Sequence, residues 1–377
     1  MRVSILGGGP GGLYFAALWK SRHPADEVRL FEQNPADTTW GFGVVFSDRA
    51  LEFLREDDAE TVDLVAPHMQ TWRDITIVHR GEAVAIDGVG FSAIGRLALL
   101  QLLHQRARSA GVTLAFGTTI GSLDDLGDSD LIVAADGVNS LLRHSFGNLF
   151  GTSLSHLGSK FAWYGTAKPF ETLTQTFVAH ELGTFNAHHY RYAPGMSTFI
   201  VECDPATWVR AGLDRATEGE SRRICEQVFA ATLQGHPLLS NRSIWRNFPW
   251  VWNDHWSVRN VVLIGDALRT AHYSIGSGTR LAIEDALALT KALEAEPDSL
   301  AAALARYEAN RRPVVEKLVA ASRMSAAWYE RFPEHMRLAP ADLAMSYIRR
   351  SGRVDDHRLR TMAPKFMALY DAGGGTP

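Results

Sequence analysis

A glycine-rich turn near the start of the chain restricts the fold more than any other feature. The apolar run 3–6 predicts a buried strand, and the run 13–18 predicts a helix. Between them, Gly7, Gly9 and Gly12 occupy the glycine positions of the dinucleotide-binding fingerprint. The first glycine allows a sharp turn, the second lets the backbone approach a pyrophosphate, and the third lets the helix pack closely on the sheet. These parts predict a βαβ unit that binds a dinucleotide.

The residues around this turn agree with that prediction. A second apolar run, 28–32, ends in Glu32, which stands 20 positions after Gly12, where a carboxylate is expected to meet a ribose hydroxyl. Pro10 lies within the glycine turn, and the free N–H groups at the start of the following helix would face a diphosphate. The alternative is a glycine-rich turn beside a surface glutamate, and the agreement of strand, turn, helix and second strand makes it the weaker interpretation.

Two distant segments repeat the arrangement of an apolar strand followed by a polar or glycine turn. The run 131–135 leads into Asp136 and Gly137, and the run 261–264 leads into a turn that contains Asp266. In a doubly wound sheet, the carboxyl ends of the strands converge on one ligand crevice. Three such strand ends therefore imply one long ligand.

The segment between the second and third strand ends has a different character. Alternating and aromatic runs predict strands at 161–167, 175–179, 184–192 and 197–202, and a hairpin at 75–79 and 83–86. Elsewhere the pattern is helical, at 48–54, 59–65, 97–110, 220–233, 284–293 and 299–328. Gly111 ends one of these helices, and Pro313 must kink or restart another.

Composition excludes several classes of function. The chain of 377 residues has a net charge of −4, which gives no general attraction to nucleic acid or to an anionic membrane. We expect no nucleic-acid partner, and no apolar run has the length of a membrane span. Two cysteines, Cys203 and Cys225, favour a reducing cytoplasm. His188, His189 and His272 have no metal-ligand spacing, so no metal is expected.

The three motifs together resemble those of the single-component flavoprotein monooxygenases that hydroxylate aromatic rings. The signatures are Gly7-x-Gly9-x-x-Gly12 with Glu32, Asp130 to Arg143 around Asp136-Gly137, and Gly265-Asp266-Ala267 followed by Gly276-Ser277-Gly278-Thr279. The resemblance implies an enzyme that uses FAD, NAD(P)H and O2 to hydroxylate an electron-rich ring through a flavin C4a-hydroperoxide. It implies that the FAD supplies the reactive chemistry while the protein orients the ring and excludes water.

The resemblance also implies roles for individual residues. Asp266 would bind the ribityl or ribose–phosphate part of FAD, and Arg96 would brace the phosphates. The cofactor-binding residues are then Gly7, Gly9, Pro10, Gly12, Glu32, Arg96, Asp136, Gly137, Asp266, Gly276, Gly278 and Thr279. The last three would lie along the flavin ring.

Four stretches resemble one subfamily more narrowly. These are 88–96, 163–166, 196–202 and 271–279. That subfamily contains hydroxylases of salicylyl-CoA and 2-aminobenzoyl-CoA and the indole hydroxylases of the violacein pathway. The chain departs from the wider family at Arg269, where a histidine is usual, and at Ser274-Ile275, where a proline is usual. Both departures concern the substrate rather than the cofactor.

Candidate substrate and catalytic residues lie near the expected flavin ring. His272 and Tyr273 precede the flavin glycines and would position substrate or take a proton, although His272 could equally be a buried histidine bound to backbone. Arg269 would hold an anionic substrate group or, more simply, brace the FAD phosphates. Tyr164, His188 and Tyr190 would line the pocket from strands. Strand alternation places His188 and Tyr190 on one face and His189 on the other, without showing which face is used.

The resemblance gives the expected fold and its divisions. The fold class is α/β, a Rossmann-like FAD-binding domain (GR2, p-hydroxybenzoate hydroxylase type) with an inserted β-rich substrate domain and C-terminal helices. The predicted divisions are 1–70, 91–153 and 258–330 for the FAD-binding domain, 71–90 and 154–257 for the substrate domain, and 331–377 for a helical tail.

The expected substrate is an aromatic acyl-CoA, with 5-hydroxylation of salicylyl-CoA as the leading hypothesis. The alternatives are an indole or another aromatic compound of secondary metabolism, and a flavin-dependent reductase that inserts no oxygen. The flavin-loop glycines argue against the reductase. A monomer and a homodimer are both compatible with the sequence.

Overall fold

A parallel sheet holds the three strand ends at one edge. The computed structural model describes residues 1–373, and within them the side chains of 48–51 are left undescribed. The strand order is β16–β17–β9–β1–β2–β8, with every pair parallel except β16 and β17. The bounds are β1 (Arg2–Leu6), β2 (Glu27–Glu32), β8 (Thr113–Phe116), β9 (Leu131–Ala134), β16 (Ser257–Val258) and β17 (Val261–Leu263). The predicted convergence of the turns after β1, β9 and β17 is confirmed.

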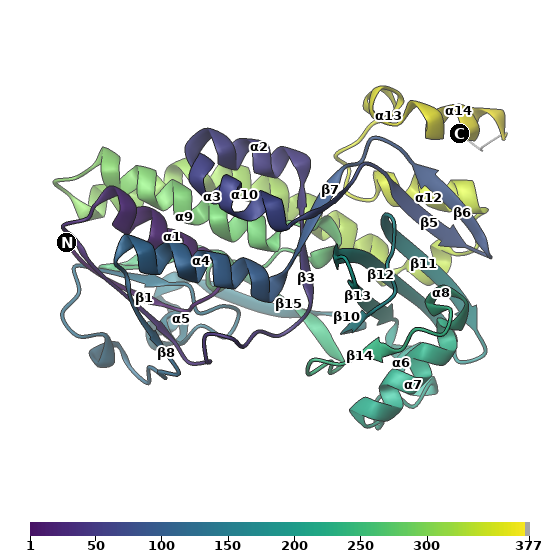
Figure 1. Ribbon diagram of the computed structural model, residues 1–377, viewed down its shortest axis with the longest axis horizontal. Helices are drawn as coiled ribbons and strands as arrows, with labels where there is room; N and C mark the ends of the chain where they lie inside the picture. Colours follow the sequence, from purple (N-terminus) through teal and green to yellow (C-terminus); the bar gives the residue numbers. More distant parts are fainter. Residues whose placement is uncertain (374–377) are drawn as a thin grey trace.

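Helices along one side of this sheet complete the first core (Figure 1). Their bounds are α1 (Pro10–Arg22), α4 (Arg96–Ala110), α9 (Gly278–Ala295) and α10 (Leu300–Glu330). α4 ends at Gly111, which has a φ of +93°, as the sequence predicted. Pro313 was expected to kink or restart α10, but it lies inside one continuous helix of 31 residues. Packing against α9 supports α10 across the lost hydrogen bond.

A second, mainly antiparallel sheet forms the β-rich part. Its order is β14–β10–β13–β12–β11–β5–β6, with β15 paired to β10. The bounds are β5 (Ile75–His79), β6 (Glu82–Ile86), β10 (Thr152–Thr166), β11 (Leu173–His180), β12 (Gly183–Ala193), β13 (Met196–Cys203), β14 (Leu238–Leu239) and β15 (Arg246–Asn253). The hairpin β5–β6 joins this sheet from a distant part of the chain.

Shorter elements connect and cover the two sheets. A three-stranded sheet, β3–β7–β4, lies between them (Figure 1). The bounds are β3 (Gly43–Ser47), β4 (Gln70–Trp72), β7 (Phe91–Gly95), α2 (Asp48–Asp57), α3 (Ala59–Val65), α5 (Leu141–Ser145), α6 (Pro205–Arg210), α7 (Glu218–Val228) and α8 (Ala230–Leu233). A capping box of Thr217 and Glu220 begins α7. No helix in the described part of the chain is long and apolar enough to cross a membrane.

The C-terminal helices pack on the β-rich sheet. Their bounds are α11 (Phe332–His335), α12 (Pro340–Arg349), α13 (Asp356–Met362) and α14 (Pro364–Ala372). α12 contacts β5 and β6, and its apolar side chains share a core with Ile75, Ile77 and Phe177. The sequence predicted helices here and left open what they cover. The structure brings this tail beside the strands that were expected to hold the substrate (Figure 1).

Candidate active site

The glycine turn after β1 has no room for side chains at two of its positions. A Cβ on Gly7 would lie 2.3 Å from the carbonyl oxygen of Ala135, and one on Gly12 would lie 2.2 Å from the carbonyl oxygen of Gly7. Gly7 also has a φ of +107°, which side chains disfavour. A Cβ on Gly9 would meet no atom within 4 Å. Packing therefore requires glycine at positions 7 and 12, whereas Gly9 borders open space.

The start of α1 and the end of β2 meet at this turn. Gly9 precedes the first residue of α1, Pro10, and no side chain caps the first turn, so its N–H groups are available to an anion. The carboxylate of Glu32 accepts the N–H of Gly8 at 2.8 Å through one oxygen and the N–H of Asn34 at 2.8 Å through the other. Glu32 is thereby fixed at the edge of the glycine turn, and its contact with a ribose stays a prediction.

The turn after β9 is organised by a carboxylate. Asp136 accepts the backbone N–H of Leu141 at 2.7 Å through Oδ2, and burial raises the pKa of this carboxyl. Its Oδ1 is buried and has no hydrogen-bond partner among the described residues. Gly137 follows with a φ of +79°. The turn therefore presents an unsatisfied acceptor beside the glycine turn of β1.

Arg143 joins two of the three strand ends. Its guanidinium donates to the carbonyl oxygen of Val138, after β9, and at 2.9 Å to that of Ala267, after β17. The side chain is 2% exposed. Sequence reasoning included Arg143 in a motif but gave it no role, because its second partner lies 124 positions away.

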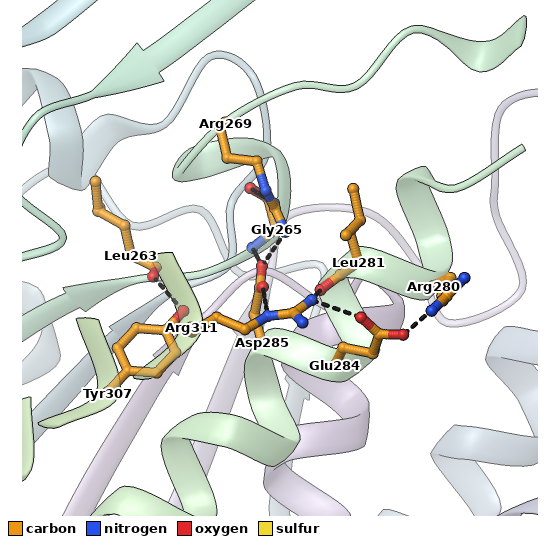
Figure 2. A network of polar contacts seen from close by, with 9 residues as sticks. All are labelled: Leu263, Gly265, Arg269, Arg280, Leu281, Glu284, Asp285, Tyr307 and Arg311. Carbon is orange, nitrogen blue, oxygen red and sulfur yellow. Dashed lines mark hydrogen bonds and ion pairs between the residues drawn. The ribbon is translucent and has the colours of Figure 1, made fainter. Parts of the chain in front are cut away.

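A buried ion network holds the turn after β17 (Figure 2). Asp285, on α9, is fully buried and accepts from Arg269 at 2.6 Å through Oδ2 and from Arg311 at 3.0 Å through Oδ1. The same Oδ2 accepts the backbone N–H of Gly265 at 3.1 Å. Arg311 also pairs with Glu284 at 2.7 Å. Two helices therefore fix the backbone of the third strand end through charged side chains.

This network corrects the catalytic role predicted for Arg269. The side chain is 2% exposed, and it donates to Asp285 and, at 2.9 Å, to the carbonyl oxygen of Gly265. A buried guanidinium with these two partners stabilises the turn from the core side and does not reach a substrate. The sequence did not identify Asp285, the partner that explains why an arginine stands at this position.

Asp266 lies at the tip of the same turn. Its side chain is exposed, although Gly265 and Ala267 on either side of it are buried. Burial lowers the pKa of the Arg96 guanidinium and the Asp266 carboxylate opposes that shift, so these two charges lie near one another. Arg96 begins α4 and donates from Nε to the hydroxyl of Thr39 at 3.0 Å. The structure thus brings together two predicted residues that are 170 positions apart.

The flavin-loop glycines lie at the start of α9. Gly276 has a φ of +59°, and Gly278 is the first residue of the helix. Among the described residues no side chain caps this helix start, so the first N–H groups, including that of Thr279, have no capping partner there. Gly276 and Ser277 also line a cavity of about 650 Å³.

The second sheet, the flavin loop and the C-terminal tail enclose this cavity. From the sheet come Ile75, Leu173, Gln175 and His188, and from the loop Tyr273 to Ser277. The tail and α9 add Tyr347, Ile348, Arg350, Arg353, Val354, Arg358, Met362 and Arg280. The cavity thus has a partly apolar floor and several arginines in its walls.

The lining of the cavity shows which face of β12 points toward it. His188 lines it, with its ring centre 6.0 Å from that of Tyr273, so the face predicted to carry His188 and Tyr190 is the one toward the cavity. His189 points to the other face, where its ring stacks on Phe199 at 5.1 Å. Burial lowers the pKa of His188 to about 4, and nearby Arg350 adds to the effect, so His188 is neutral at pH 7.

The structure corrects the substrate-binding roles of Tyr164 and Tyr190. Tyr164 lies on the opposite face of the sheet, in the core under α7, where its hydroxyl bonds that of Ser221 at 3.0 Å. Tyr190 shares the face of His188, but its hydroxyl donates to the carbonyl oxygen of Gly43 at 2.8 Å and its ring packs against Trp72. Neither tyrosine lines the cavity.

His272 also lies behind the cavity wall rather than in it. The side chain is 1% exposed, and its Nδ1 is 2.8 Å from the hydroxyl of Ser274. Burial lowers the pKa of His272 to about 3, so it is neutral at pH 7. Its ring packs against that of Tyr273, which does line the cavity. The bound, buried histidine is therefore the alternative that the structure supports.

Sequence reasoning missed a buried carboxyl beside Tyr273. Glu202, on β13, is 3% exposed and hydrogen-bonds the Tyr273 side chain. Asn186 on β12 lies 3.5 Å from it, and the charge of Glu330 on α10 adds to the rise of its pKa. Burial is the largest cause that raises the pKa of Glu202 to about 8. Strand alternation could have indicated it, because Glu202 pairs with Asn186 on the cavity face.

The raised pKa of Glu202 predicts a pH-dependent stability. The folded chain holds this proton up to pH about 8 and the unfolded chain only to about 4.5, so the folded state binds more protons in that window. The contribution is fully present below pH 4.5 and is lost as the pH rises through 8. We expect the free energy of unfolding of wild type, relative to Glu202→Gln, to fall by up to about 1.4 kcal/mol per pH unit.

Urea unfolding at pH 5, 6.5 and 8 measures this difference. Glu181→Gln, which removes an exposed carboxylate, is the control. Its free energy of unfolding should change with pH as that of wild type does. If the free energy of unfolding of Glu202→Gln also changed with pH as that of wild type does, the raised pKa of Glu202 would be contradicted.

The residues at the three strand ends fit an FAD molecule. Open space at Gly9 and the uncapped start of α1 suit a diphosphate. The unsatisfied Oδ1 of Asp136 and the exposed carboxylate of Asp266 are acceptors for the hydroxyl groups of a ribose and a ribityl chain. Among the described residues, no group of three His, Cys, Asp or Glu side chains could hold a metal ion.

Comparison with known proteins agrees with this geometry. The chain belongs to the FAD binding domain family, whose model matches residues 1–322. It is an FAD-dependent aromatic monooxygenase. A salicyloyl-CoA 5-hydroxylase of a Streptomyces species is 40% identical over 361 residues, 93% of this chain and 70% of that protein. The 3-hydroxy-4-methyl-anthranilyl-[aryl-carrier protein] 5-monooxygenase of Streptosporangium sibiricum is 38% identical over 89% of this chain and 90% of that protein.

A solved structure shares the fold. The crystal structure of a 2-methyl-3-hydroxypyridine-5-carboxylic acid oxygenase variant covers 96% of this chain and 96% of its own, with a TM-score of 0.74 at 18% identity. At this identity the likeness supports the predicted fold class and carries no argument about substrate.

Proposed function

We propose that this enzyme hydroxylates the ring of an aromatic acyl thioester, with 5-hydroxylation of salicylyl-CoA as the leading reaction and NAD(P)H as the reductant. The observation that carries the proposal is the cavity of about 650 Å³, which combines flavin-loop residues, a histidine and tyrosine floor, and arginines. A ring would lie against the floor, and the anionic part of its carrier would lie along the arginines. Relatives that act on a CoA thioester and on a carrier-protein thioester support this reading.

We propose that the three strand ends hold FAD as the motifs predict. Glu32 would bind the adenosine ribose, the turn around Gly9 the diphosphate with Arg96, and Asp266 the ribityl chain. Gly276, Gly278 and Thr279 would border the flavin ring. When bound, FAD would pass electrons from NAD(P)H to O2 and so supply the chemistry of ring hydroxylation. The chain orients the ring, keeps water from it, and holds protons at Tyr273 and Glu202.

The carrier end of the proposed substrate would meet two exposed arginines of the tail. Arg353 and Arg358 both line the cavity, and the side chain of Arg358 donates to the carbonyl oxygen of Arg353 at 3.2 Å. Guanidinium groups bind phosphate strongly and in two-pronged geometry. CoA and a phosphopantetheine arm both carry phosphate, and both would be attracted to this wall.

The decisive experiment measures NADH and NADPH oxidation by the FAD-loaded enzyme with salicylyl-CoA, 2-aminobenzoyl-CoA, salicylate and indole. Mass analysis then checks for a product that has gained one oxygen atom. We expect oxidation and hydroxylated product with a CoA thioester. Stimulation by salicylate or indole alone would overturn the thioester assignment. Peroxide without a hydroxylated product would overturn the substrate and leave the cofactor in place.

Reversing the charge of one tail arginine should weaken binding of the thioester substrate and leave hydroxylation of its ring unchanged. We expect Arg358→Glu to raise KM for salicylyl-CoA by roughly 5- to 10-fold with kcat nearly unchanged, because a phosphate contact of about 1 kcal/mol is lost. The dependence of KM on salt should weaken as well. Arg210→Glu, an exposed arginine on α6, is the matched control. Equal KM values for both variants would contradict this role.

A further inference from the structure

Two buried polar atoms on the sheet side of the cavity have no hydrogen-bond partner among the described residues. Gln175 on β11 is 2% exposed and His188 on β12 is 6% exposed. The two residues stand directly opposite each other across the paired strands. In the described part of the chain, no group bonds Oε1 of Gln175 or Nδ1 of His188. Both side chains line the cavity that also contains Tyr273 and Gly276.

An unsatisfied pair of this kind is uncommon in a folded interior. Most buried polar atoms have a partner, because an unpaired one loses its bond to water without replacement. Directly opposed residues in a sheet lie close enough to bond each other, yet these two atoms do not. Their shared exposure to one cavity points to a bound molecule that supplies the missing bonds.

The chemistry of the two side chains defines what that molecule must carry. Oε1 of Gln175 only accepts hydrogen bonds. The imidazole of His188, neutral at pH 7, has one nitrogen that donates and one that accepts. A group that both donates and accepts, such as a hydroxyl, satisfies both partners, and an amino group satisfies the acceptors. A bare ring carbon satisfies neither.

We propose that Gln175 and His188 form a polar clamp that binds a hydroxyl or amino substituent of the substrate's ring. This inference rests on the proposed function for the aromatic substrate and adds the residues that select it. The substituent that makes the ring electron-rich is then also the group that the protein recognises. A ring that lacks this substituent can enter the cavity but leaves the clamp without hydrogen bonds. A site of this kind discriminates strongly against the analogue.

Ligand titration of the FAD-loaded enzyme tests the clamp without turnover. Perturbation of the flavin absorbance gives Kd for two matched pairs, salicylyl-CoA with benzoyl-CoA and salicylamide with benzamide. We expect the hydroxylated member of each pair to bind roughly 10- to 100-fold more tightly to wild type. 2-Aminobenzoyl-CoA should bind like salicylyl-CoA. Gln175→Leu should reduce the preference in both pairs to within a few-fold.

A control separates the clamp from general loss of polarity in β11. Thr174→Val removes a hydroxyl from the neighbouring residue, which faces the other side of the sheet and bonds Thr172. It should keep the full preference. Gln175→Met is the second variant should the leucine variant fail to fold, and wild type alone already decides whether a preference exists.

The outcomes distinguish the clamp from the proposed function. A donor preference in the amide pair, together with no binding of either thioester, would support the clamp and overturn the thioester assignment. Equal Kd values within both pairs for wild type would overturn the clamp while leaving the thioester assignment intact. A preference that survives in both Gln175 variants would overturn the clamp as well. No binding of any of these ring ligands would overturn both.

Discussion

Gly12→Ala yields a protein that is purified without FAD. The new Cβ would lie 2.2 Å from the carbonyl oxygen of Gly7, a distance that backbone atoms must move apart to relieve. That movement separates α1 from β1 and displaces the N–H groups that we propose bind the diphosphate. We expect FAD affinity to fall by about 100-fold or more, which is about 3 kcal/mol. Overpacking should also lower the free energy of unfolding by about 1–3 kcal/mol. FAD titration and urea unfolding of the apoprotein measure the two effects.

Two further glycine variants separate packing from cofactor contact. Gly9→Ala places a Cβ where no protein atom lies within 4 Å, so we expect normal apoprotein stability with weakened FAD binding. Gly219→Ala, in α7, also adds a Cβ that meets nothing within 4 Å and should leave both quantities nearly unchanged. A Gly12→Ala protein that retains FAD as wild type does would contradict the role of this turn.

Asp285→Asn should cause the largest loss of stability. The carboxylate is fully buried and is shared by Arg269 and Arg311, so its removal leaves the buried Arg269 guanidinium without its charge partner and Arg311 with Glu284 alone. Breaking a buried ion pair from one side costs about 3–5 kcal/mol. The turn that carries Asp266 loses its anchor at the same time, so FAD should stabilise the variant less than wild type. Urea unfolding with and without FAD measures both quantities.

A surface ion pair provides the control for this prediction. Glu294 pairs with Arg22 at 3.2 Å, and both side chains are about one-third exposed. Glu294→Gln should therefore cost less than about 1 kcal/mol. Equal losses for Asp285→Asn and Glu294→Gln would show that the buried network contributes no more than a surface pair.

The parts of the molecule that follow from the sequence are those where local spacing carries the signal. Gly7, Gly12 and Glu32 could be placed because a tight turn and a neighbouring strand end lie within one short segment. The turns at Asp136 and Asp266 could be added because parallel strands bring their carboxyl ends to one edge. The fold class followed from these three points together.

The substrate side could be predicted only in part, because its contacts join distant segments. Arg269 stands beside the flavin glycines in sequence, but its partner on α9 turns it into the core. Tyr164 faces away from the cavity because of the parity of its position on β10, and the face in use depends on what covers each side. Gln175 and Glu202 look like ordinary strand residues until the cavity is seen.

The cavity is built from two parts of the chain, the region shared with the family and the C-terminal tail. The region shared with the FAD binding domain family ends at residue 322, whereas Arg350, Arg353 and Arg358 belong to helices and turns beyond it. Substitution of Arg353 or Arg358 can therefore remodel one wall of the cavity while the contacts that hold the turns after β1, β9 and β17 stay in place. Under the proposed function, exchange of this segment between relatives is a route by which the acyl carrier could change while the flavin chemistry is kept. A chimera of two such enzymes should then take its carrier preference from the tail.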